Sequence, residues 1–371
     1  MAGRNDAGSD EDVALLAAFP IGDDRIRLVF SGPIDAESAL DARNYRSAVG
    51  LGAHAAELAP KANLDARSAS SMRVTLTTDP MSGYSLVVDS ITAEGVRSRS
   101  GKPLTSIESP PFIHGIASIP GIQWPVSDAS PFSSRFEGNV ATASCQKDGG
   151  VNSNRLIDAF GWCFLHVERG GPFNSIKVAT KKHVPGIDEE VKRLSPRGLS
   201  PHVLWSGGEI RTVDGETRLV DTGFMEGSIL DATPKHFPPP FRIKTRDLTD
   251  DEAKSLRAKS LQGVIVRFEN VTIDSVADRD QHETWVSAPG LRSFDFHDDS
   301  GASLTAVILD SVDRDVRPGD SFESLRALMH QPRSGYYEAI VELDDHFNYP
   351  LGWPDGLSHR PSRDAPTAPA D

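Results

Sequence analysis

Two clusters of acidic residues and histidine could do chemistry in this sequence. They are His297, Asp298 and Asp299 in the stretch SFDFHDDSG, and Asp344, Asp345 and His346 in the stretch ELDDHFNY. A hard cation needs about six converging oxygen ligands, for which histidine is a poor choice. A zinc site needs three or four His or Cys at ligand spacing, and the chain has no H-E-x-x-H or C-x-x-C motif. We interpret both clusters as solvated turns and expect no metal; a site shared by the two clusters is the alternative.

The first cluster also fits a β-hairpin. Phe294 and Phe296 alternate with polar residues, as expected for the two faces of one strand. The following residues 299–301, Asp-Ser-Gly, are suited to a tight reversal, with glycine where a positive φ is needed. We therefore predict a hairpin over residues 293–307 and assign no catalytic residue to it.

Four aromatic residues of the same region are candidate ligand-binding residues: Trp285, Phe296, Tyr336 and Tyr337. Small Greek-key barrels bind oligonucleotides or sugars through aromatic side chains on their outer face. The alternative is that most of these rings fill the barrel. Residues 241–350 contain 13 Lys and Arg against 21 Asp and Glu, a net charge of −8. This charge disfavours a nucleic-acid groove, because affinity for nucleic acid comes from neutralising phosphates, and leaves protein or saccharide ligands open.

The whole chain is acidic, with 371 residues, a formal charge of −14 and an isoelectric point near 5.2. Nucleic acid is therefore disfavoured as a partner over most of the surface. No apolar run approaches the roughly 18 residues of a membrane span, so we expect no membrane insertion. The first residues are polar and acidic, unlike a signal peptide.

The sequence contains no other motif that indicates an enzyme or a bound cofactor. No G-x-S-x-G elbow, Walker loop or kinase set occurs, so we expect a protein that is not an enzyme. The stretch GLGAHA, residues 50–55, matches G-x-G-x-x-A but lies among predicted antiparallel strands, not in a βαβ unit. We expect a loop there and no cofactor. The only cysteines, Cys145 and Cys163, form a disulfide only if a hairpin brings them opposite each other, which the sequence leaves open.

The elements that carry these residues are mostly strands. Apolar residues recur with period two in short runs bounded by Gly, Pro, Asp and Ser, and 26 prolines and 31 glycines favour many turns. Two short helices are predicted, one at 249–263 from a Thr-x-x-Glu capping box and one at 184–198 from an apolar stripe.

Changes in composition predict three structured units. The boundaries are a disordered N-terminus (1–12), a first unit (13–116), a linker (117–134), a second unit (135–235), a third unit (236–352) and a disordered tail (353–371).

The first unit resembles the bacterial Ig-like domains of surface-layer proteins. Landmarks of that family occur in order: Ser31, Pro33, Ile34, Asp35, Asn44, Tyr45, Tyr84, Leu86, Val88 and Gly101. The resemblance implies a β-sandwich with a spacing or adhesive role. The chain departs from the family at Ser100-Gly101-Lys102, where Gly-Asn is usual, and in a long insertion before residue 72.

The third unit resembles the OB-fold modules that accompany exported bacterial nucleases. Its matching landmarks are all structural: Gly263, Val264, Asn270, Val271, Asp299, Gly301, Gly319, Asp320, Gly335 and Tyr336. The second unit has the element order strand, strand, strand, helix, strand, strand, which is the order of a five-stranded Greek-key barrel. We therefore predict an all-β chain, an Ig-like sandwich followed by two OB-like barrels with few short helices.

These observations predict a non-enzymatic, modular bacterial binding or scaffolding protein, a component of a larger assembly or of the cell envelope. The alternative is an accessory protein that binds single-stranded nucleic acid or saccharide for an associated enzyme. A hydrolase using the Asp and His clusters is the third hypothesis. Both resemblances are typical of exported proteins, and the sequence names neither the partner nor the oligomeric state.

Overall fold

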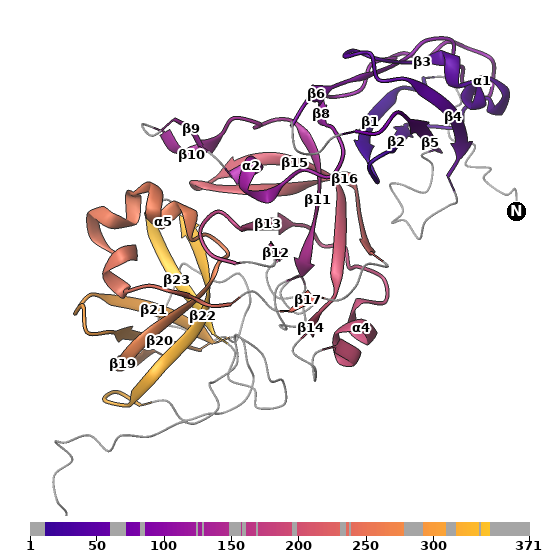
Figure 1. The fold of residues 1–371 in the computed structure, drawn as a ribbon. Helices are drawn as coiled ribbons and strands as arrows, with labels where there is room; N and C mark the ends of the chain where they lie inside the picture. Colours follow the sequence, from indigo (N-terminus) through magenta and orange to yellow (C-terminus); the bar gives the residue numbers. More distant parts are fainter. Residues whose placement is uncertain are drawn as a thin grey trace, which may run out of the picture.

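In the computed structural model, the described residues form mainly strands with a few short helices (Figure 1). The described residues are 12–59, 72–81, 86–123, 125–127, 130–147, 157, 161–167, 170–194, 199–230, 235–236, 239–277, 292–308, 317–333 and 335–341. They form a sandwich and two closed barrels, as the sequence predicts. None of the described helices is long and apolar enough to cross a membrane.

The N-terminal unit is built on an antiparallel four-stranded sheet with the order β1-β2-β5-β4. The strands are β1 (Leu15–Pro20), β2 (Arg25–Phe30), β5 (Met72–Thr78) and β4 (Ala53–Leu58). A pair of short strands, β3 (Tyr45–Ser47) and β7 (Ile91–Ala93), shares its apolar core. In the chain, α1 (Ala36–Leu40) and the 3-10 turn η1 (Ala42–Asn44) lie between β2 and β3.

The landmarks of the Ig-like resemblance have structural roles in this unit. The Asp35 carboxylate accepts the Ser38 N–H at 2.8 Å and caps α1. The buried Tyr45 hydroxyl donates to the Ala39 carbonyl at 2.8 Å. Gly101 has a φ of +84°, which a turn can use and most residues cannot. Tyr84 lies outside the described residues.

The middle unit is a closed five-stranded barrel. Its strands are β11 (Val140–Lys147), β12 (Trp162–His166), β13 (Ser175–Ala179), β15 (His202–Val213) and β16 (Glu216–Ile229). They follow the order β11-β12-β13-β16-β15, and β15 pairs with β11 to close the ring; only the β13–β16 pairing is parallel. The helix α4 (Ile187–Leu194) lies between the third and fourth strands, where a Greek-key barrel of this type is expected to have it. Strand β14 (Leu199–Ser200), just before β15, pairs with β17 (Lys235–His236), which follows β16.

The C-terminal unit repeats this topology. Its ring is β19 (Ile265–Ala277), β20 (Arg292–His297), β21 (Ser303–Ile308), β23 (Tyr336–Val341) and β22 (Ser321–Arg333), closed by β22 on β19. A short strand β18 (Phe241–Arg242) runs parallel to β19. Three short helical turns precede the ring: η3 (Thr245–Leu248), η4 (Asp250–Lys254) and α5 (Leu256–Ser260). The predicted single helix at 249–263 is therefore interrupted at Ser255, whose hydroxyl accepts the Ala258 N–H and starts α5.

The first two units share one sheet. Strand β8 (Phe112–Ile113) pairs in parallel with β11, and β6 (Val88–Asp89) pairs with β8, so that the sheet of the middle barrel has seven strands. The segment expected as a linker contains α2 (Ile119–Gln123), β9 (Pro125–Ser127) and β10 (Ser130–Ser134). Ile119 and Ile122 are buried in the core of the middle barrel, which explains why a Pro- and Ser-rich segment is ordered there.

The structure corrects one further expectation and answers one question that the sequence left open. The second half of the GLGAHA stretch, residues 53–55, begins the edge strand β4 and pairs antiparallel with β5, so it is not a loop. The strand register also excludes the disulfide. Gln146 lies opposite His166, so Cys145 and Cys163 lie four residues apart along the pair, about 13 Å, beyond the reach of a disulfide.

Candidate functional site

The first cluster, residues 297–299, lies on the β20–β21 hairpin of the C-terminal barrel. The register confirms the predicted hairpin by pairing His297 with Ser303. Asp298 is buried and accepts hydrogen bonds from the Thr245 N–H (3.0 Å), the Thr245 hydroxyl (2.8 Å) and the Ser300 N–H (2.9 Å). Burial by itself would raise the pKa of Asp298, but the hydrogen bonds from Ser300 and Thr245 outweigh it and lower that pKa. Asp298 thus fastens the hairpin to η3 as a carboxylate.

The neighbouring residues have similar structural roles. The His297 ring contacts the Asp274 carboxylate through Nδ1 at 2.6 Å on the partly exposed outer face of the strand. The Asn270 amide donates to Asp299 at 2.6 Å, and Gly301, with a φ of +77°, donates its N–H to the Asp298 carbonyl. These contacts show a turn, but Asp298 is buried, so the expectation that the whole cluster is solvated is wrong for this residue, whose carboxylate is held by η3.

The possible meeting of the two clusters is not visible, because Asp344, Asp345 and His346 lie outside the described residues. Within the described part of the chain, no three His, Cys, Asp or Glu side chains are grouped so that they could hold a metal ion.

The candidate aromatic residues do not come together on the outer face in the described part of the chain. Phe296 and Tyr337 are buried in the core of the C-terminal barrel, where Phe296 packs edge-to-face on Phe268 at 5.2 Å. Tyr336 is partly buried, with its hydroxyl 3.3 Å from that of Thr305. Trp285 lies outside the described residues. Phe296 and Tyr337 thus fill the barrel, as the alternative interpretation expects.

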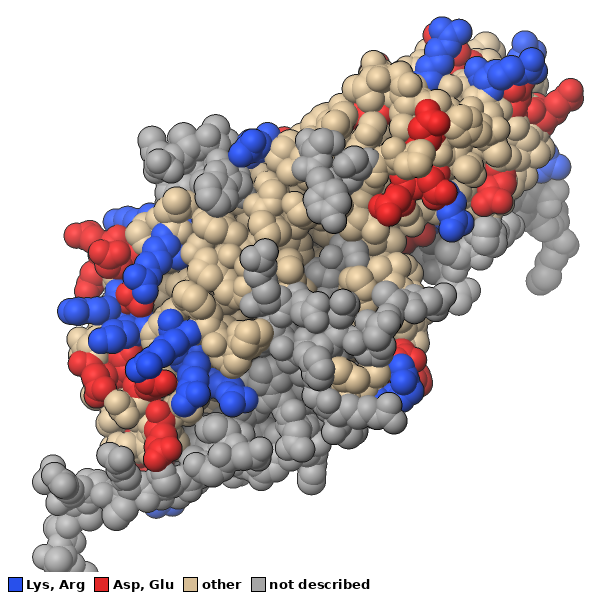
Figure 2. Space-filling model, in the orientation of Figure 1, with Lys and Arg blue, Asp and Glu red and all other residues tan. Residues whose placement is uncertain are grey.

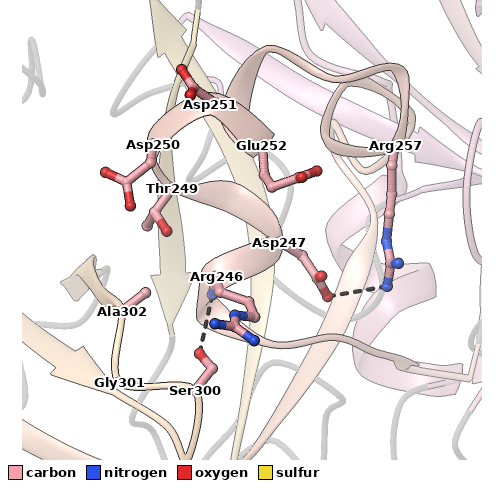
Figure 3. A pocket seen from close by; sticks show the side chains of 10 residues that line it. All are labelled: Arg246, Asp247, Thr249, Asp250, Asp251, Glu252, Arg257, Ser300, Gly301 and Ala302. Atoms are coloured by element: carbon pink, nitrogen blue, oxygen red, sulfur yellow. Dashed lines mark hydrogen bonds and ion pairs between the residues drawn. The ribbon is translucent and has the colours of Figure 1, made fainter.

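A polar pocket of about 660 Å³ opens beside the hairpin turn (Figure 3). Its lining residues come from η3, η4, α5 and the turn: Arg246, Asp247, Thr249, Asp250, Asp251, Glu252, Arg257, Ser300, Gly301 and Ala302. Arg257 and Asp247 form an ion pair of 3.1 Å across one side. The carboxylates of Asp250 and Asp251 point in different directions and do not converge on one point (Figure 3). The pocket therefore lacks the geometry of a paired-carboxylate acid/base site.

A more unusual concentration of charge lies at the junction of the two barrels. The Lys177 ammonium on β13 donates to the Glu216 carboxylate at 2.8 Å and to Nε2 of His330 on β22 at 2.8 Å. Its nitrogen also lies 4.4 Å from the centre of the Trp162 ring. All three polar side chains are buried. Because an ammonium has no lone pair, Nε2 must be the acceptor, and His330 is neutral with its proton on Nδ1.

Burial shifts the pKa values of this cluster. Burial lowers the pKa of Lys177 to about 8 against the opposing effect of Glu216, and it lowers that of His330 well below its usual value. The neighbouring Glu338, opposite His330 in the β22–β23 register, has its pKa raised by burial to about 8, with the charge of Lys177 acting in the opposite direction. Perturbed groups of this kind cluster at functional sites and also in structural ion-pair networks.

Apolar and amide contacts surround the charged cluster. Five buried side chains form a separate apolar cluster across the junction: Trp162, Phe164, Ile265, Leu328 and Ile340. The Gln262 amide donates to the Gly215 carbonyl at 3.0 Å and to the Gln331 side chain. The cluster is thus filled with side chains from both barrels and works as a joint between them.

One further triplet resembles a hydrolase site by composition only. The Ser47 hydroxyl and the His114 ring both bond to the same oxygen of Asp89, at 2.6 and 2.8 Å. A serine nucleophile requires histidine, not aspartate, as its direct partner. Since Asp89 lies between the other two, the triplet connects β3, β6 and the segment after β8.

Sequence reasoning missed the junction cluster. Lys177, Glu216, His330 and Glu338 occupy alternate, outward positions of strands, where a charged residue normally faces water. No local sequence pattern distinguishes an outward position that a second barrel covers from one that faces water.

Comparisons with known proteins give only weak similarity. No family model and no curated protein matches the sequence. Among solved structures, the N-terminal part of the bacterial S-layer protein SbsC is 14% identical with a TM-score of 0.23, and the match covers 28% of this chain and 24% of that one. The Ifi202 HINa domain in complex with 20bp dsDNA is 12% identical with a TM-score of 0.26, covering 56% of this chain and 94% of that one. A longer SbsC fragment is 8% identical with a TM-score of 0.22, covering 87% of this chain and 58% of that one. The chain thus spans about a quarter of the first of these structures, and S-layer domains are weak structural neighbours that carry no argument about its function.

Proposed function

We propose that this chain is a non-enzymatic, modular scaffolding or binding protein, a component of a larger protein assembly or of a bacterial cell envelope. The observation that supports the proposal is that its three units are joined by buried contacts. A scaffold must hold its modules at fixed positions, and buried interfaces between modules restrict their relative motion.

The contacts between the first two units are of several kinds. The Thr142 hydroxyl of β11 donates to the Pro20 carbonyl at the end of β1. Arg73 of β5 pairs with Glu226 of β16. Gly207 of β15 lies so close to the Phe19 ring of β1 that an added Cβ would meet it at 3.0 Å. These contacts add to the strand pairing of β8 with β11.

The test is whether the native chain is part of a large assembly whose formation depends on the rigid junction. We expect the chain, after cross-linking in its own cells, to sediment far above its own mass of 40.1 kDa. The variant Lys177→Met should loosen the junction, broaden the particle dimensions in small-angle X-ray scattering and reduce the fraction in the assembly. The exposed Lys181 provides the matched control, Lys181→Met, which should change neither.

Sedimentation of the wild-type chain as a free monomer in its own cells would contradict the proposal. So would a folded Lys177→Met variant with a disrupted junction that still enters the assembly at the wild-type level.

A further inference from the structure

Three arginines lie side by side across the outer wall of the C-terminal barrel. The register pairs Arg242 of β18 with Arg267 of β19, and Arg267 with Arg326 of β22. Neighbouring strands are about 4.8 Å apart, so the three Cα positions span roughly 10 Å. We call Arg242, Arg267 and Arg326 the arginine row.

The row faces outward. Val266 and Phe268, on either side of Arg267, belong to the barrel core, and so do the two residues on either side of Arg326, Leu325 and Ala327. Two residues further along the same face, Ile265 and Leu328 lie opposite each other and are covered by the middle barrel. The arginine row therefore lies next to the junction, on the part of this face that the middle barrel does not cover. Figure 2 shows Lys and Arg side chains, mixed with Asp and Glu, over the C-terminal barrel.

The charges of the row are only partly compensated. Glu269 pairs with Arg242 and lies 3.8 Å from Nε of Arg267. Arg326 has no hydrogen bond or ion pair with any residue that the structure describes, and the Nε atoms of Arg267 and Arg326 are buried without an acceptor there. Among the residues that the structure describes, three guanidinium groups therefore share one carboxylate. Like charges placed directly opposite in a sheet are destabilising, and a buried donor without an acceptor costs free energy.

We propose that the arginine row binds an acidic segment of a partner protein, through at least two carboxylates. Arginine presents a planar fork of donors that matches a carboxylate in a bidentate arrangement. Arg267 and Arg326, which have no full partner within the described ranges, lie on neighbouring strands and fit two such groups on one extended peptide. The surrounding barrel has a net charge of −8, which repels a long polyanion passing beyond the row but leaves a short acidic segment bound locally. The inference stands on the row alone and does not need the scaffolding role.

The experiment uses the full chain and three labelled probes of equal length, namely an Asp- and Glu-rich peptide, a Gly- and Ser-rich peptide and oligo(dT), with fluorescence anisotropy as the readout. The acidic peptide should bind, and added salt should weaken it because the surface charges are screened. The double variant Arg267→Gln/Arg326→Gln should lower the affinity by roughly tenfold or more, since each lost charge-assisted contact weakens binding. The control Arg211→Gln removes an exposed arginine of the middle barrel that pairs with Glu209 and should leave the affinity unchanged.

A second measurement distinguishes binding from a structural role. Because the row places like charges together, Arg326→Gln should keep or raise the melting temperature while it weakens peptide binding. A lowered melting temperature with unchanged binding would overturn the proposal. Absence of acidic-peptide binding at low salt would also overturn it, as would tighter binding of oligo(dT) through the same arginines, which would make the row a nucleic-acid surface.

Discussion

Replacement of Lys177 by methionine tests whether the charged cluster holds the two barrels together. The substitution keeps the length of the apolar stem and removes the ammonium, which leaves the Glu216 carboxylate fully buried. Breaking a buried ion pair from one side costs about 3–5 kcal/mol, because the remaining charge is not compensated. Arg218 still pairs with Glu216, with Nε at 2.9 Å, so we expect a loss near the lower end, about 3 kcal/mol in the free energy of unfolding.

The assay is urea denaturation monitored by tryptophan fluorescence, in which Trp162 reports on the junction because Lys177 packs against its ring. Two variants serve as controls. Lys181→Met, at an exposed position, should change stability by less than about 0.5 kcal/mol. The double variant Lys177→Met/Glu216→Gln should be more stable than Lys177→Met alone, because it removes a buried carboxylate that only Arg218 still pairs with. A loss below about 1 kcal/mol for Lys177→Met, or a double variant that is less stable still, would refute the reasoning.

The remaining predictions concern the same joint and the hairpin turn. Burial raises the pKa of Glu338 from 4.5 to about 8, so between these pH values the folded state holds a proton that the unfolded state releases. The free energy of unfolding should therefore fall by about 1.4 kcal/mol per pH unit as pH rises from about 4.5 to 8. Glu338→Gln should remove this slope in denaturation measured at several pH values. Asp298→Ala should lower the free energy of unfolding by about 3 kcal/mol at neutral pH, since charge-assisted hydrogen bonds are lost. Because the pKa of Asp298 is lowered in the folded state, the difference from wild type should shrink as pH falls below about 4. An equal loss of stability at pH 3 would contradict this. Gly263→Ala should open the junction to limited proteolysis, because Gly263 has a φ of +67° and an added Cβ would overlap the Phe164 ring; Gly301→Ala, with a similar φ and open space around it, is the control and should leave the junction resistant.

The sequence predicts the strands and their order well, because alternating apolar residues and turn residues are local signals. The hairpin around Phe294 and Gly301 is an example, since both the inward-facing rings and the turn glycine can be recognised from the sequence. The predicted helix at 249–263 was wrong as a single helix, because the Thr249 side chain does not cap it and Ser255 starts a separate turn.

The joints between units could not be predicted in the same way. Lys177 and His330 are 153 residues apart in the sequence, and each looks like an ordinary exposed residue of its own strand. Their contact depends on how two finished barrels pack, which no periodicity within either one encodes. The same holds for Arg242, Arg267 and Arg326, whose alignment follows from strand register between distant segments.

The pairing of β8 with β11 has a consequence for how this chain can be divided. The segment from Pro111 to Ala117 runs beside β11, with the Val140 N–H donating to the Pro111 carbonyl and the Ala117 N–H to the Thr142 carbonyl. A fragment that begins after residue 117 would lose this neighbour and present the edge of β11 to other molecules, which favours aggregation. The N-terminal unit is therefore not an independent domain that recombination could exchange freely. A fragment meant to fold should retain residues 111–117 with the middle barrel.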